Sequence, residues 1–211
     1  MKNKIILSVL ITFLNFWIWR VFGEDTLLGV VLIFLSISLI FRFRILTVVL
    51  FLVLSVVFLK TNPDTNLMYI SPLEKHWLIQ RHEYYAESLG SIYRNRAGLY
   101  LNYELLPYVF KYTRNLGYNL DPNLYFFANH PRERGGGIEF EKFSPFLLPL
   151  FIVGVLILVS GRDKFLISYF IAAQLVNALA FPGYMLGPIL IFPFITATIY
   201  LGAIWIFRME T

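Results

Sequence analysis

Long apolar blocks occupy both ends of the chain, and a polar, tyrosine-rich segment separates them. A helix needs about 20 apolar residues to cross the ~30 Å core of a bilayer. The second and third blocks are short by that measure, so a re-entrant hairpin over 26–59 is the alternative to two spans. The pattern predicts an all-α integral membrane protein with six spans: Ile5–Phe22, Thr26–Phe41, Ile45–Leu59, Pro145–Ser160, Phe165–Phe181 and Gly187–Phe207. Residues 1–60 and 144–211 would each supply three helices, with residues 61–143 as an insert between spans three and four.

The charges between the blocks predict the orientation. If six spans alternate, Glu24, Asp25 and the uncharged loop Pro182–Leu186 fall on one side. The positive-inside rule then places both termini in the cytoplasm and residues 60–143 outside a bacterial-type cytoplasmic membrane. The basic residues that fall together on the predicted cytoplasmic side are Lys2, Lys4, Arg42, Arg44, Arg162, Lys164 and Arg208.

Two helices are predicted in the insert. Ser71 and Glu74 form a capping box around Pro72, so a helix should begin at Pro72, reach about Ser88 and stop near Gly90. A second helix is expected over Leu101–Leu116, where Pro107 either introduces a kink or marks the true start.

The end of the insert and its tyrosines complete the expected architecture. Asp121–Asn123 predicts a turn, and Leu124–Ala128 predicts either a strand or a segment that dips into the membrane interface. Ten of the thirteen tyrosines lie in the insert, and tyrosine favours the headgroup layer. We therefore expect a membrane-hugging insert that lies flat and caps the bundle. Trp17 and Trp19 are likewise expected at the membrane–water interface.

Composition narrows the function classes. The chain has 211 residues, of which 58% are hydrophobic and 15% charged, with a net charge of +5. Segment 60–143 contains ten Lys/Arg and nine Asp/Glu, so this near-neutral segment argues against a nucleic-acid partner. His76, His82 and His130 lack metal-ligand spacing, and there is no cysteine, so we predict neither a metal site nor a cofactor.

The loop after the aromatic run is the first candidate site. Arginine forks bind phosphate through two hydrogen bonds, and glycines let backbone N–H groups approach an anion. Arg132, Arg134, Gly135, Gly136 and Gly137 could therefore contact a lipid headgroup or a polyprenyl phosphate. The alternative is an exposed loop in which the arginines pair with Glu133.

Two further sets of polar residues could carry chemistry. Glu24 and Asp25 could act as a general base or as metal ligands, or they could only favour the start of the next helix. Gln174 and Asn177 could line a substrate path, or they could hydrogen-bond across packed helices.

An aromatic run at Leu124–Phe127 is followed by the loop Arg132–Gly137 and by a span that begins at Leu148-Pro149 and reaches Gly154. This order of motifs, from about residue 90 to 207, resembles the late region of bacterial GT-C-type membrane glycosyltransferases, which use polyprenyl-phosphate sugars. Enzymes of that family carry a catalytic acid in a large first outer loop, whereas the loop around Glu24 is only a few residues long. The resemblance implies a shared scaffold and lipid-phosphate contact, without a catalytic assignment.

The expected function is a non-catalytic accessory or envelope-assembly subunit that contacts membrane lipids, polyprenyl phosphate among them, and a membrane-protein partner. A glycosyltransferase with Glu24 or Asp25 as its base is one alternative. A structural membrane oligomer is the other.

The topology can be tested with reporter fusions. A reporter that is active only outside the cytoplasm should be active after Asn95 and silent after Asp163, because the loop charges place these positions on opposite sides. The reverse activities would contradict the orientation.

Overall fold

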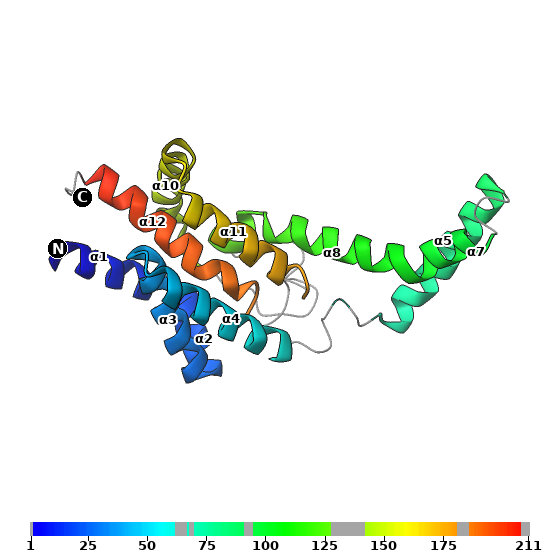
Figure 1. Cartoon of the computed structure of the whole chain (residues 1–211), viewed down its shortest axis with the longest axis horizontal. Coiled ribbons are helices and arrows are strands. Elements are labelled where there is room, and N and C mark those ends of the chain that lie inside the picture. The colour runs from blue at the N-terminus through cyan, green and yellow to red at the C-terminus, as the bar shows by residue number, and fades with distance from the viewer. Residues whose placement is uncertain are drawn as a thin grey trace.

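The fold is all-helical in the parts of the chain that the computed structural model describes, residues 2–61, 67, 70–90, 95–127, 142–180 and 186–207 (Figure 1). No strand occurs within these ranges. Short turns of 3₁₀ helix at Pro145–Leu147 and Ile189–Ile191 directly precede the helices that begin at Leu148 and Phe192, and a π-helical turn covers Leu101–Leu105. The helices are α1 (Lys2–Phe13), α2 (Phe16–Glu24), α3 (Thr26–Ile40), α4 (Arg44–Thr61), α5 (Pro72–Leu89), α7 (Arg96–Tyr100), α8 (Leu106–Asn119), α9 (Asn123–Phe126), α10 (Leu148–Gly161), α11 (Lys164–Asn177) and α12 (Phe192–Ile206).

Helix α12 forms the centre of the bundle. It packs against α1, α3, α10 and α11, and nearly all of its residues are buried. The helix is apolar all round, which is typical of a helix that is enclosed by other helices or by lipid.

Two glycines bring α10 and α12 into backbone contact. A methyl group added at Gly154 would lie 1.9 Å from the carbonyl oxygen of Thr198, and one added at Gly202 would lie 2.0 Å from that of Leu150. Small residues at crossing points are how membrane helices approach closely enough to gain van der Waals contact. The position of α10 on α12 therefore depends on both glycines.

The first apolar block is a broken helix and not the straight span that the sequence predicts. Asn15, which is buried, accepts a hydrogen bond from the Ile18 N–H at the start of α2. Its side-chain amide also donates to the Thr12 carbonyl at 2.6 Å. This side chain therefore ends α1 and caps α2, and the two helices meet at 68°.

One unbroken helix in the described ranges is long and apolar enough to cross a membrane: Ile189–Ile206. The number rises to three if two bent pairs of helices each count as one span. The first pair is α1 with α2. The second pair is α10, together with the 3₁₀ turn before it, and α11. The second of these pairs bends by 117°. The six-span topology therefore stays a prediction.

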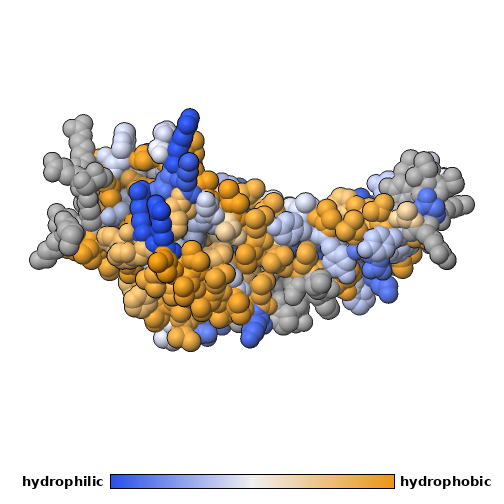
Figure 2. Space-filling model, viewed as in Figure 1, coloured by the Kyte–Doolittle hydropathy of each residue, from blue (hydrophilic) through white to orange (hydrophobic). Residues whose placement is uncertain are grey.

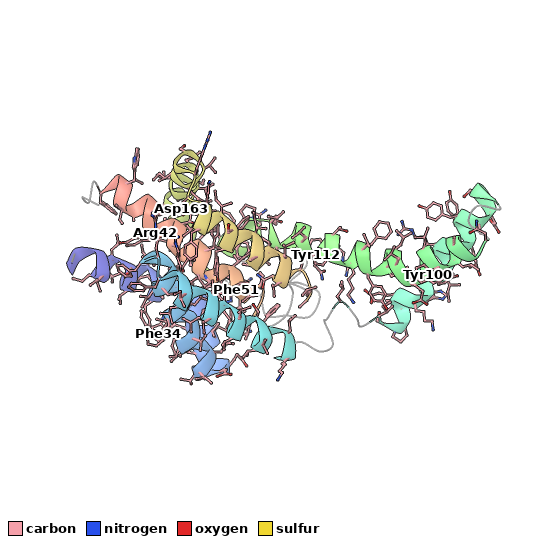
Figure 3. The ribbon with its side chains drawn as sticks, viewed as in Figure 1. Phe34, Arg42, Phe51, Tyr100, Tyr112 and Asp163 are labelled. Atoms are coloured by element: carbon pink, nitrogen blue, oxygen red, sulfur yellow. The ribbon has the colours of Figure 1, made fainter. Side chains whose placement is uncertain are left out.

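An ion pair joins two of the helix corners. The Arg42 guanidinium donates to the Asp163 carboxylate at 2.6 Å, which links the α3–α4 corner to the α10–α11 corner (Figure 3). Arg42 and Arg162 both adopt left-handed backbone conformations there, with φ of 60° and 48°. The two corners thus lie at the same end of the bundle, as the charge pattern predicts.

The insert forms an arm that projects from the bundle. The capping box of Ser71 and Glu74 is present, and α5 ends before Gly90, whose φ is +67°, so this predicted helix is confirmed. In Figure 1, α5, α7 and the start of α8 extend away from the other helices. Among the described parts of the insert, α5 and α7 do not lie over the bundle, and the membrane-hugging placement of the insert stays a prediction.

The second insert helix is longer than the sequence predicts and is interrupted. Asn95 caps α7 by accepting from the Gly98 N–H, and the helical path continues to Asn119. Pro107 is the second residue of α8, and the π-helical turn ends two residues before it, at Leu105. Proline lacks an N–H and its ring crowds the carbonyl four residues earlier, and an extra residue in the turn relieves that conflict.

The arm returns to the bundle at an aromatic cluster. The segment predicted as a strand or an interface dip is instead the short buried helix α9, because Asp121 accepts from the Asn123 N–H and starts a turn. Trp17 is fully buried here, which corrects its predicted place at the membrane interface, whereas Trp19 is 58% exposed. The Trp17 indole donates to the Leu186 carbonyl at 2.7 Å, and its backbone N–H donates to the Lys142 carbonyl. The rings around Trp17 are Tyr125, Phe143 and Phe192.

Alanine at Gly154 or at Gly202 should lower the melting temperature of the protein in detergent. The added methyl group must push α10 and α12 apart, and overpacking of this kind costs about 1–3 kcal/mol. For a chain of this size the shift should be roughly 3–10 °C.

Gly117→Ala is the matched control. Gly117 lies within α8, and a methyl group there meets nothing within 4 Å. This variant should be unchanged or slightly more stable, because alanine favours a helix over glycine by about 0.5–1 kcal/mol. Equal melting temperatures for all three variants would show that the close crossing does not stabilise the fold.

Candidate functional site

A cleft with a cavity volume of about 290 Å³ lies between α5 and α8 in the arm. In Figure 2 the surface of the arm shows polar and apolar residues side by side. Among the described residues that line the cleft, three are cationic and one is acidic. The lining residues are Ile70, Glu74, Trp77, Leu78, Arg81, Pro107, Phe110, Lys111 and Arg114.

Glu74 connects the two walls of the cleft. Its carboxylate accepts the Ser71 backbone N–H at 3.0 Å, which completes the capping box of α5. The same carboxylate lies 3.7 Å from the Lys111 ammonium and 3.8 Å from the Arg114 guanidinium, both on α8. One acid thus both caps α5 and ties it to α8.

Several causes act on the pKa of Glu74. Partial burial raises it, but the hydrogen bonds from Ser71 and the positive charges of Lys111 and Arg114 together outweigh that effect and lower the pKa below its usual value. Glu74 is therefore ionised when the cleft is intact at neutral pH.

Aromatic rings hold the third cation. The Arg81 guanidinium lies 4.6 Å from the centroid of the Phe110 ring and 5.5 Å from that of Tyr85. Such cation–π contacts fix the direction of a guanidinium while leaving its N–H groups able to donate. Trp77 is 61% exposed on the same side of α5 and gives the cleft an apolar rim.

The arrangement suits an anion attached to an apolar body. Arg81 and Arg114 can each donate two hydrogen bonds to a phosphate, and Lys111 adds a point charge. The rings of Trp77 and Phe110 would contact the less polar part of the same molecule.

The predicted phosphate loop, Arg132, Arg134 and Gly135–Gly137, lies outside the described residues, as does His130. Glu24 and Asp25 lie at the α2–α3 junction. The Asp25 carboxylate accepts the backbone N–H groups of Leu27 and Leu28, at 2.8 and 3.1 Å, so it acts as the cap of α3. In Figure 1 this junction and α8 lie on opposite sides of α12.

Gln174 and Asn177 contact neighbouring elements, as one of their two interpretations predicts. Gln174 donates to the Asn119 carbonyl at 3.2 Å, and Asn177 donates to the Pro188 carbonyl at 3.3 Å. On α8, Asn115 donates in the same way to the Ala178 carbonyl, and the Tyr112 hydroxyl donates to the Leu175 carbonyl. The bonds of Tyr112, Asn115 and Asn119 hold the base of the arm against α11.

Sequence reasoning missed the cleft cations. A local signal for them exists, because Pro107, Phe110, Lys111 and Arg114 follow the i, i+3, i+4, i+7 spacing of one helix face. No local signal pairs that face with α5.

No model of a protein family, no curated protein and no solved structure matches the chain. Within the described ranges, no three His, Cys, Asp or Glu side chains converge in a group that could hold a metal ion.

Glu74→Gln should weaken the start of α5 in a pH-dependent way. Since the folded pKa is lowered, the ionised carboxylate stabilises the fold above its unfolded pKa, and this contribution is lost as the pH falls through the folded value. Hydrogen exchange of the α5 amides should show a loss of about 0.5–1 kcal/mol at pH 7. Near pH ~3 the variant and the native protein should converge.

Glu83→Gln is the control for this measurement, because Glu83 is exposed on the same helix. A loss that is equally large at both pH values would show that the Glu74 charge does not contribute.

Proposed function

We propose that the chain is a six-span membrane protein that binds an anionic lipid headgroup through its extracytoplasmic arm and works as a non-catalytic accessory or envelope-assembly subunit. The cleft of Arg81, Lys111 and Arg114 beside Trp77 carries this proposal. Its natural ligand is a lipid phosphate, polyprenyl phosphate among the candidates. The suggested kinship with GT-C-type transferases is part of the same proposal.

The chemistry of the cleft supports a lipid over a free anion. Glu74, Lys111 and Arg114 form a charged group in the cleft, and Arg81 lies against the ring of Phe110. Trp77 and Leu78 add apolar surface to the same lining. A free phosphate would use only the cations, whereas a lipid headgroup with its glycerol or isoprenoid neck would also contact the apolar side chains.

Arg132 and Arg134 enter the proposal as a second set of phosphate contacts. They follow α9 in the chain, and α9 follows α8, which carries half of the cleft. The glycines Gly135–Gly137 would give backbone access to the same or a neighbouring headgroup.

A glycosyltransferase is the weaker alternative. Asp25 already serves as a helix cap, which leaves Glu24 as the acid available for a catalytic role. Neither Glu24 nor Asp25 lines the arm cleft.

A structural oligomer is favoured by one observation, the exposed aromatic residues of the arm. Tyr84 and Tyr100 are exposed, and Tyr100 lies far from the bundle (Figure 3). Paired arms would cover these rings, and the experiment below reports the oligomeric state directly.

Native mass spectrometry of the purified full chain tests the lipid proposal, with dioleoyl phosphatidylglycerol against dioleoyl phosphatidylcholine as probes. Arg81→Ala with Arg114→Ala should lower phosphatidylglycerol binding by more than tenfold. The two charge-assisted contacts are worth about 1.5–3 kcal/mol each, and about 1.4 kcal/mol is one decade of affinity.

Two double variants with the same charge change complete the design. Lys60→Ala with Lys75→Ala removes two exposed cations outside the cleft and should bind as the native protein does. Arg132→Ala with Arg134→Ala reports on the loop. If phosphatidylglycerol binding falls in the loop variant alone, the headgroup binds at the loop and not in the cleft. Equal binding by all variants would contradict headgroup recognition.

A further inference from the structure

A second cavity, of about 390 Å³, lies among α9, α10, α11 and the start of α12. Its volume falls in the range of about 300–1,000 Å³ that is typical of small-molecule sites. Most of its wall is apolar, with Phe151, Val155, Phe170 and Ile195 facing the space from three helices. Among the described residues that line it, none is charged.

The cavity exists because of how α10 leaves α12. Gly154 fixes the close crossing, and the chain then turns through 117° into α11. Side chains of α10, α11 and the start of α12 line the space between these helices and do not fill it.

Two buried carboxamides stand at the polar end of this cavity. Asn119 is 0% exposed and Gln174 is 4% exposed, and both line the space. Gln174 donates to the Asn119 backbone carbonyl, which also accepts the Tyr125 hydroxyl at 2.6 Å. The Gln174 side-chain oxygen has no hydrogen-bond partner within the part of the chain that the structure describes.

Asn119 differs from the neighbouring carboxamides. Asn115 and Asn177 each use their amide nitrogen on a backbone carbonyl. In Asn119 neither the side-chain oxygen nor the nitrogen has a hydrogen-bond partner among the described residues. Because a buried amide without partners is costly, a bound polar group would recover stability at this position.

We propose that this cavity binds a neutral single-chain alcohol, a fatty or isoprenoid alcohol, with its chain along the apolar wall and its hydroxyl at Asn119 and Gln174. A hydroxyl donates one hydrogen bond and accepts others, which matches the free carboxamide oxygens and the free amide of Asn119. A charged headgroup does not fit, because a charge buried without a counter-charge is strongly disfavoured. Val159 at the wall is exposed and gives the chain a route from the bilayer.

The proposal is independent of the arm cleft, because the two cavities share no residue. The test uses the full chain in a nanodisc and a C12 alcohol with a photoreactive diazirine in its chain. Cross-links should map to α10 and α11. Unlabelled 1-dodecanol should compete at least tenfold better than dodecane or dodecyl phosphate, and Asn119→Leu should reduce that preference over dodecane to about twofold.

Val155→Trp should block the cavity and abolish the cross-link. Ile152→Trp is its matched control, because Ile152 is exposed on the same helix and does not line the cavity. Cross-linking that survives Val155→Trp would overturn the proposal. Dodecane competing as well as dodecanol on the native protein would overturn it too, and that measurement needs no variant to fold.

Discussion

The backbone contact between α10 and α12 is the constraint from which the rest of the bundle follows. Gly154 and Gly202 let carbonyl oxygens of the opposite helix occupy the space that side chains would take. In lipid, helices gain little from excluding water, so close approach is a main source of their attraction. With α10 fixed in this way, α12 is enclosed by its neighbours. The chain then turns into α11, and the cavity beside Asn119 lies between α10 and α11.

Side-chain amides organise the places where helices end. Asn15 joins two helices at a bend, and Asn115 and Gln174 each satisfy a backbone carbonyl at the end of a helix. Helix ends leave such carbonyls without intrahelical partners, and an apolar environment offers no water to replace them. The side chain of Asn119 differs, because neither of its polar atoms has a hydrogen-bond partner among the described residues. We therefore assign this side chain to ligand binding.

Features that depend on neighbouring residues predicted where the helices of the arm begin and end. Contacts between segments that are distant in the chain were not predicted. The box of Ser71 and Glu74, the stop at Gly90 and the turn at Asp121 depend on neighbouring residues alone, and each is present. The break at Asn15 was missed because apolar periodicity outweighs one amide in a window of 18 residues.

Burial of Trp17 and the pairing of Glu74 with Lys111 could not be predicted from local pattern. Both depend on segments that are distant in the chain, Lys142 and Leu186 in the first case and α8 in the second. The predicted phosphate loop at Arg132–Gly137 lies outside the described residues, so that part of the site stays a prediction.

The central position of α12 has a consequence for biosynthesis. Every other described helix precedes α12 along the chain, yet α1, α3 and α10 all pack against it. A ribosome adds about 5–20 residues per second, so the earlier helices wait for seconds before their shared partner exists. Contacts among α1, α2, α3 and α4 do not need α12, whereas the surfaces of α1, α3 and α10 that pack on α12 lack their partner during that interval, so this part of the bundle closes last.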